Sequence, residues 1–247
     1  MSGHSKWATI RHKKGAQDAK RGKLFSKLIK EITVAAKMGG GEEESNPRLR
    51  TAVLKAKGAN MPKDNIDRAI KKGTGDLGGE DFVELSYEGY GPNGVAILVN
   101  TLTDNRNRTA ADVRSIFSKN GGNLGESGCV SYLFSRKGLI TFDTDAYGED
   151  QILEAALEAG ADDVESAGDV IEVSTSPEDF EAVLGVLNAA GFEHTVAEIS
   201  LIPEATVSLD DEGTRKALRL IDLLDDHDDV QEVATNLDIP DDFDPEG

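Results

Sequence analysis

The stretch FVELSYEGYGPNGVAILVNTL, residues 82–102, separates two kinds of hydrophobic pattern in this chain. Apolar and polar residues alternate over 82–88, and a mostly aliphatic run fills 95–102. Both patterns are typical of β-strands, and the glycines and Pro92 between them indicate a turn. The sequence therefore predicts a β-hairpin, from which the fold can be worked out in both directions.

Before the hairpin, the hydrophobic residues recur with a helical period. One helix is predicted over 17–38 and ends at three glycines, residues 39–41. A second begins after Asn46, a good N-cap that is followed by a proline, and a third runs from Pro62 to Gly73. The bundle is preceded by a polar, basic arm over 1–15 and followed by a linker over 74–80.

After the hairpin, Thr109 and Asp112 resemble a capping box and predict a helix to Lys119. A strand is expected over 129–134. Residues 138–200 show the order β-α-β-β-α-β of a ferredoxin-like domain. A helix over 214–224 and a strand over 230–234 are expected to return to the first sheet.

These elements predict an α+β protein, a three-helix bundle followed by two α/β domains. We expect the bundle and arm in residues 1–75 and an α/β domain in 76–137 and 201–240. The ferredoxin-like domain, 138–200, is inserted in the second. The acidic end, with a tail over 241–247, is expected to fray from Asp238 onward.

The net charge of -19 is distributed very unevenly. Residues 1–75 carry +11, residues 76–137 carry -2 and residues 138–247 carry -28. The single cysteine, Cys129, excludes a disulfide within the chain and favours a reducing, cytoplasmic location. No apolar run of about 18 residues is present, and no secretory signal is predicted.

Several short motifs have simpler structural explanations. The spacing of glycines over 89–94 matches a dinucleotide fingerprint, but a strand follows where a helix is needed. Gly22-Lys23 resembles the end of a Walker A loop with the wrong spacing. Asp143 and Glu154 stand where an EF-hand loop has ligands, yet Tyr147 replaces an oxygen donor, which favours a strand-to-helix turn.

The remaining polar candidates give no catalytic or metal site. The acidic run 225–229 can hold a cation, although such runs at helix ends are usually solvated. The four histidines lack ligand spacing, and Cys129 is predicted to belong to the core. We therefore expect no enzyme activity, no cofactor and no small-molecule substrate.

The basic N-terminal part is the strongest functional signal. Lysines of the first helix form a stripe about 100° wide, and like charges repel unless an anion compensates them. The polar loop 103–109 adds arginines that can contact phosphates or base edges. The nucleic-acid-binding residues predicted from these features are Lys6, Trp7, Arg11, His12, Lys13, Lys14, Lys20, Lys23, Lys27, Lys30, Arg106 and Arg108.

The chain resembles the YebC family over nearly its whole length. The residues that carry the resemblance are SGHSKW (2–7), IRHKK (10–14), PKDN (62–65), AIKKG (69–73), YEGYGP (87–92) and TDNRNRT (103–109). The resemblance implies a cytoplasmic, non-enzymatic regulator of gene expression that binds DNA. It maps the family motifs onto Lys6, Trp7, Arg11, Lys13 and Lys14 in the arm, and onto 104–108 in the loop. The acidic C-terminal half departs from the pattern.

Three alternatives remain beside the DNA-binding regulator, the last of them an unrecognised metal-dependent enzyme that uses the many carboxylates. The resemblance also implies a ribosome-associated translation factor that binds ribosomal RNA and relieves stalled peptide-bond formation, similar to a mitochondrial translational activator. From another class, residues 138–247 are acidic enough to form a module that binds a basic protein. No membrane partner is expected, because the apolar face of the first helix is needed in the bundle core.

Overall fold

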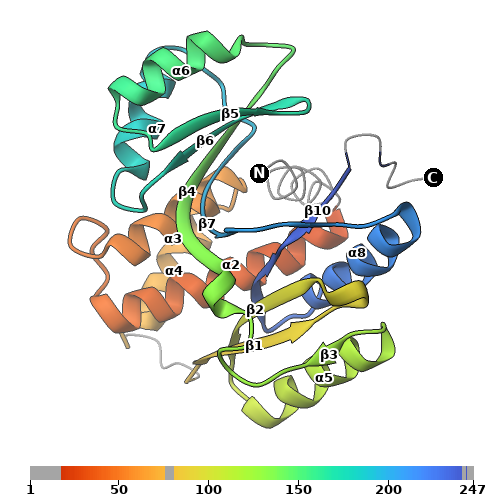
Figure 1. Cartoon of the computed structure of the whole chain (residues 1–247). Coiled ribbons are helices and arrows are strands. Elements are labelled where there is room, and N and C mark those ends of the chain that lie inside the picture. Colours follow the sequence, from red (N-terminus) through yellow and green to blue (C-terminus); the bar gives the residue numbers. More distant parts are fainter. Residues whose placement is uncertain (1–17, 76–80, 241–242, 244–247) are drawn as a thin grey trace.

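The computed structural model describes residues 18–75, 81–240 and 243 (Figure 1). Three helices, α2 (Asp18–Gly39), α3 (Pro47–Gly58) and α4 (Lys63–Gly73), form the predicted basic bundle. Their apolar faces meet in a hydrophobic core of their own, which includes Leu28, Ile32, Leu49, Val53 and Ile66.

The bundle is held by local features that the sequence indicates. The side chain of Asn46 caps α3 by accepting a hydrogen bond from the backbone N–H of Leu49 at 3.0 Å. Its amide nitrogen also donates to the carbonyl of Ala35 in α2 at 2.8 Å. At Gly73 a Cβ atom would lie 2.3 Å from the carbonyl oxygen of Thr33, so only glycine permits this approach of α4 to α2.

The predicted hairpin forms the centre of a four-stranded sheet. β1 (Val83–Tyr90) pairs antiparallel with β2 (Ala96–Thr103), with Tyr90 opposite Ala96. The strand order is β3-β1-β2-β9, where β3 is Asn123–Leu124 and β9 is Val230–Thr235. Helices α5 (Arg106–Lys119) and α8 (Asp211–Asp225) pack on one face, and the shared core includes Ile97, Val99, Phe117 and Ile221.

A second sheet contains β4 (Phe134–Asp143), β5 (Asp163–Ala167), β6 (Val170–Thr175) and β7 (Val196–Pro203) in the order β5-β6-β4-β7. All neighbouring strands are antiparallel. Helices α6 (Glu149–Glu158) and α7 (Phe180–Ala189) complete the β-α-β-β-α-β order. The chain then returns through α8 to β9, beside β2 (Figure 1). The α+β class is confirmed.

Two local predictions are wrong. Helix α5 begins at Arg106 with Asn105 as its N-cap, not at Thr109, whose hydroxyl is used inside the loop. Residues 129–133 form a loop and a short 3₁₀ turn, Ser131–Leu133, because the carboxylate of Glu88 accepts hydrogen bonds from their backbone. The short strand β3 was not predicted.

The acidic end is also more ordered than expected. Strand β10 (Leu237–Asp238) pairs in parallel with β8 (Val207–Ser208). Ile239 and Phe243 are buried in the core of the first sheet, which anchors this segment beyond Asp238. Fraying from Asp238 is therefore wrong for these residues, while 241–242 and 244–247 lie outside the described part.

The structural explanations of the short motifs are confirmed. Asn93 and Gly94 adopt positive φ angles in the tight turn between β1 and β2, and a strand follows. Gly22 and Lys23 lie within α2. Asp143–Gly148 connects β4 to α6, with the Tyr147 ring packed edge-on against Phe142 and Phe192. Among the described helices, none is long and apolar enough to cross a bilayer.

Candidate nucleic-acid interface

Lysines of the stripe on α2 contact the end of α8 and the segment that follows it. Lys23 Nζ donates to the backbone carbonyl of Asp226 at 3.1 Å, and Lys30 Nζ donates to that of Asp228 at 2.9 Å. Lys27 donates to the carbonyl of Asp225 and also lies 3.5 Å from its carboxylate. The anion that compensates these lysines is therefore supplied by the chain itself.

Two properties of α8 make its end attractive to cations. The last carbonyls of a helix lack intrahelical partners and carry the negative end of the helix dipole. The last turn of α8 contains no basic residue of its own. Lys23 and Lys27 of α2 therefore satisfy this helix end, and the acidic run 225–229 is neither merely solvated nor arranged around a metal ion.

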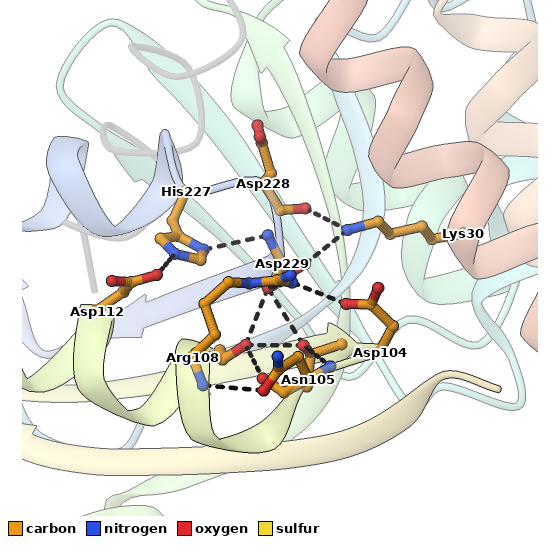
Figure 2. Close-up of polar contacts among 10 residues, drawn as sticks. Lys30, Asp104, Asn105, Arg108, Asp112, His227, Asp228 and Asp229 are labelled. Carbon is orange, nitrogen blue, oxygen red and sulfur yellow. Dashed lines mark hydrogen bonds and ion pairs between the residues drawn. The ribbon is translucent and has the colours of Figure 1, made fainter. Parts of the chain in front are cut away.

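Asp229 is the centre of the polar network in Figure 2. Its Oδ1 accepts a hydrogen bond from Lys30 at 2.8 Å, and its Oδ2 accepts from Arg108 at 2.7 Å and Thr109 at 2.9 Å. Thr103 adds a contact at 3.2 Å. The carboxylate is only 4% exposed, so these donors replace the water that it has lost.

This environment fixes the charge of Asp229. Burial by itself raises the pKa of the carboxyl, but the hydrogen bonds from Lys30, Arg108 and Thr109 outweigh burial and hold the pKa well below its usual range. The pKa of the Arg108 guanidinium is raised in turn, mainly by its hydrogen bonds to Asp229 and Asp104. The network therefore places two basic side chains, Lys30 and Arg108, around one buried carboxylate.

The loop 103–109 owes its shape to the start of α5. Asn105 caps the helix by accepting from the backbone N–H of Arg108 at 3.1 Å. The guanidinium of Arg108 reaches both Asp104, at 2.8 Å, and Asp229. Arg106 is exposed and makes no hydrogen bond or ion pair with another described residue. The two predicted arginines thus have different surroundings.

A shallow, open groove of about 620 Å³ lies beside this network. Lys23 and Lys30 line it from α2, and Arg108 lines it from α5. Lys30 also places its ammonium 5.7 Å from the ring centroid of Phe82. Residues from the lysine stripe and from the arginine loop, which are far apart in the sequence, therefore meet at one groove.

His227 completes the wall of the groove (Figure 2). Its Nδ1 accepts from the backbone N–H of Asp229 at 3.1 Å, so Nε2 carries the ring proton toward Asp112, 3.4 Å away. The sequence singles out the loop 103–109 and the run 225–229 separately, but it does not bring Thr103, Thr109 and Asp229 together in one site and does not indicate Asp112. Nothing local to Asp229 could have identified it, because its partners lie 120 or more positions away.

The other predicted site residues are not all described. The side chain of Lys20 and the residues Lys6, Trp7, Arg11, His12, Lys13 and Lys14 lie outside the described part. Cys129 lies in the loop after β3, half-buried against a small core, and burial raises the pKa of its thiol. Where residues are described, no group of His, Cys, Asp and Glu is arranged to hold a metal ion.

Comparison with known proteins identifies the family. Residues 5–76 match the TACO1/YebC protein N-terminal domain, and residues 82–237 match the TACO1/YebC second and third domain. A probable transcriptional regulatory protein of Treponema denticola is 61% identical over 98% of each chain. One from Treponema pallidum is 60% identical over 97% of this chain and 98% of the relative.

A solved structure supports the same assignment. The crystal structure of a conserved hypothetical protein from Aquifex aeolicus superposes with a TM-score of 0.80 at 52% identity, covering 90% of this chain and 92% of that one. The resemblance found in the sequence motifs is thus confirmed. Since the matched domains together span most of its length, the chain belongs to the TACO1/YebC family.

Proposed function

We propose that this protein is a cytoplasmic, non-enzymatic regulator of gene expression that binds nucleic acid through its basic N-terminal part. The Treponema relatives, named probable transcriptional regulatory proteins, support a regulatory role. We also propose the division into domains 1–75, 76–137 with 201–240, and the inserted 138–200, followed by the tail 241–247.

The observation that carries the proposal is the meeting of Lys23, Lys30 and Arg108 at one open groove, where they are paired with groups on its acidic side, which is formed by Asp104, Asp112, Asp226, Asp228 and Asp229. Cations gathered from separate elements around a concave surface suit a phosphate backbone, because each contact that forms releases a condensed counterion. Arg106 adds an exposed guanidinium that makes no hydrogen bond or ion pair with another described residue. The arm residues Lys6, Trp7, Arg11, His12, Lys13 and Lys14 and the stripe residues Lys20 and Lys27 belong to the proposed surface.

DNA is the target that the names of the relatives favour, and ribosomal RNA is the alternative. The decisive experiment is ultraviolet crosslinking in cells, followed by sequencing of the nucleic acid recovered with the full chain. Enrichment of promoter DNA supports a transcriptional regulator, whereas ribosomal RNA supports a ribosome-associated translation factor. The control is a chain with Lys6, Arg11, Lys13 and Lys14 changed to Gln, which should recover several-fold less. Equal recovery from both chains would contradict binding through the arm.

A further inference from the structure

The helical bundle meets the rest of the protein mainly through charged side chains. Its hydrophobic core is a cluster of its own, separate from the cores of the two sheets. The ion pairs that cross between the bundle and the sheets are Lys27–Asp225, Lys30–Asp229, Lys37–Asp81, Arg48–Glu84, Arg50–Glu181 and Lys55–Glu198. In each pair the bundle supplies the cation and the remainder supplies the anion.

The same contacts cover the lysines that a polyanion would use. The side chains of Lys27 and Lys30 are 12% and 19% exposed, and the ammonium of each is bonded to the segment 225–229. A phosphate approaching Lys27 from outside therefore meets the carbonyl and carboxylate of Asp225 already in place. In the arrangement described, the stripe is occupied by an internal anion.

We propose that the segment 225–229 is an electrostatic latch, and that a nucleic-acid backbone displaces it from α2 when it binds. This inference rests on the proposed function, since it assigns the nucleic acid to the lysine stripe. The phosphates and the acidic segment compete for Lys23, Lys27 and Lys30. The closed protein is a lower-affinity form, and the bundle moves relative to the first sheet when the competitor wins.

The energetics of the interface permit this release. Partly exposed ion pairs each contribute little to stability, and salt screens them. A nucleic acid offers a linear array of charges, so it can replace several weak contacts together. Because the hydrophobic clusters of the described residues do not join the bundle to the sheets, release exposes little apolar surface among these residues.

The latch segment also remains supported after release. Asp229 keeps its hydrogen bonds from Arg108 and Thr109, both on α5, when Lys30 leaves. The backbone N–H of Leu102 still donates to the carbonyl of Asp229 at 2.8 Å, which ties the segment to β2. The open form therefore has a prepared acidic surface to which α2 can return.

The test changes Asp225, Asp226 and Asp228 to Asn in the full chain. This removes the carboxylate that contacts Lys27 and lowers the negative potential around the backbone carbonyls that Lys23 and Lys30 contact, while Asp229 stays intact. Binding to a fluorescent 20-nucleotide RNA of random sequence and to a random duplex is measured at about 50 mM salt. The matched control changes Asp150, Glu154 and Glu158 on α6 to Asn, Gln and Gln, which removes the same charge from exposed positions away from the latch.

The latch predicts a roughly tenfold lower Kd for the Asn variant, as expected if the open fraction rises from about one tenth to near unity. The control variant should change the Kd by about twofold or less. Equal tightening in both variants would mean long-range repulsion instead of a latch, and an unchanged Kd in the Asn variant would overturn the proposal as well.

A second measurement needs no nucleic acid. Acetylation of lysines by a water-soluble reagent, followed by mass spectrometry, should be slow at Lys27 in the wild-type chain and fast at exposed Lys57. The Asn variant should raise the rate at Lys23, Lys27 and Lys30 and leave the rate at Lys57 unchanged. A wild-type Lys27 as reactive as Lys57 would contradict the closed form. If the triple variant fails to fold, Asp225→Asn alone removes the carboxylate nearest Lys27 and serves the same comparison.

A separate variant distinguishes a failure of the proposed function from a failure of the latch. If changing Lys23, Lys27 and Lys30 to Gln leaves the Kd unchanged, the stripe does not bind nucleic acid, and both proposals fall for this surface. If the Gln variant weakens binding while the Asn variant leaves it unchanged, the function stands and only the latch is refuted.

Discussion

Nζ of Lys30 in α2 lies 2.8 Å from Oδ1 of Asp229, a residue 199 positions later at the start of β9. This contact joins the bundle to the first sheet. On its other oxygen, Asp229 accepts from Arg108 and Thr109. One buried carboxylate therefore connects the lysine stripe with the start of α5, and the stability of this connection can be measured.

Replacing Asp229 by Asn should destabilise the protein by about 1–3 kcal/mol, because charged donors lose their anion and one amide N–H₂ faces other donors. Asp228→Asn is the matched control, since Asp228 is exposed and engages Lys30 only through its backbone. We expect the control to stay within about 0.5 kcal/mol. Urea unfolding followed by circular dichroism measures the free energy of unfolding of both variants. Equal values would show that the Asp229 carboxylate does not stabilise the fold.

The effect of Asp229 should depend on pH in one direction. The pKa of Asp229 is lower in the folded chain than in the unfolded chain, where it is about 3.9. Its contribution to the free energy of unfolding is therefore present above that value and is lost as the pH falls toward the folded pKa. The gap in unfolding free energy between the wild type and Asp229→Asn should be constant from about pH 7 to pH 5 and narrow below about pH 4. A gap that changes between about pH 8 and 6 would assign the effect to another group.

The carboxylate of Glu88 should hold the loop that contains Cys129. It accepts from the backbone N–H groups of Gly128, Val130 and Ser131 at 2.7–2.8 Å. Glu88→Gln places an amide nitrogen against these donors, and we expect a loss of about 1–3 kcal/mol. Cys129 should also react several-fold faster with a thiol reagent. The control is Glu126→Gln, which removes an exposed charge near the same thiol. It should leave the unfolding free energy nearly unchanged.

The lysine stripe should determine the salt dependence of binding. If Lys23, Lys27 and Lys30 each contact a phosphate of duplex DNA, changing all three to Gln should flatten the log–log salt slope by about 2.7, at about 0.9 per contact. Glutamine keeps the helix propensity. The control changes Lys57, Lys63 and Lys71, which lie elsewhere on the bundle. A similar change of slope in both variants would show only a general charge effect.

Local chemistry allowed much of the fold to be predicted from the sequence. Asn46 followed by proline specifies the start of α3, and the turn around Asn93 specifies the hairpin, because each signal acts within a few residues. The start of α5 was misplaced because Thr109 looks like a cap, whereas its hydroxyl serves Asp229, 120 positions away. The meeting of Lys30, Arg108 and Asp229 depends on the same long-range packing, which no local pattern records.

The two arginines of the loop 103–109 should separate binding from stability. From the sequence alone, both arginines are expected to behave as surface residues. Arg106 fits that expectation, since it is exposed and makes no hydrogen bond or ion pair with another described residue. Arg106→Gln should therefore weaken nucleic-acid binding and change the unfolding free energy by no more than about 0.5 kcal/mol. Arg108 differs, because its guanidinium bonds to Asp229.

Arg108→Gln should therefore lower the melting temperature as well as weaken binding, since it deprives a buried carboxylate of one of two cations. Arg108→Lys separates the contribution of the charge from that of the planar guanidinium. Lysine keeps the charge but cannot bridge Asp104 and Asp229 with a planar group. It should recover part of the stability. The measurements are thermal melting and RNA binding for the three variants at one salt concentration. If Arg108→Gln melts at the wild-type temperature, Lys30 alone is sufficient to stabilise Asp229, and Arg108 is then available to a phosphate in the same way as Arg106.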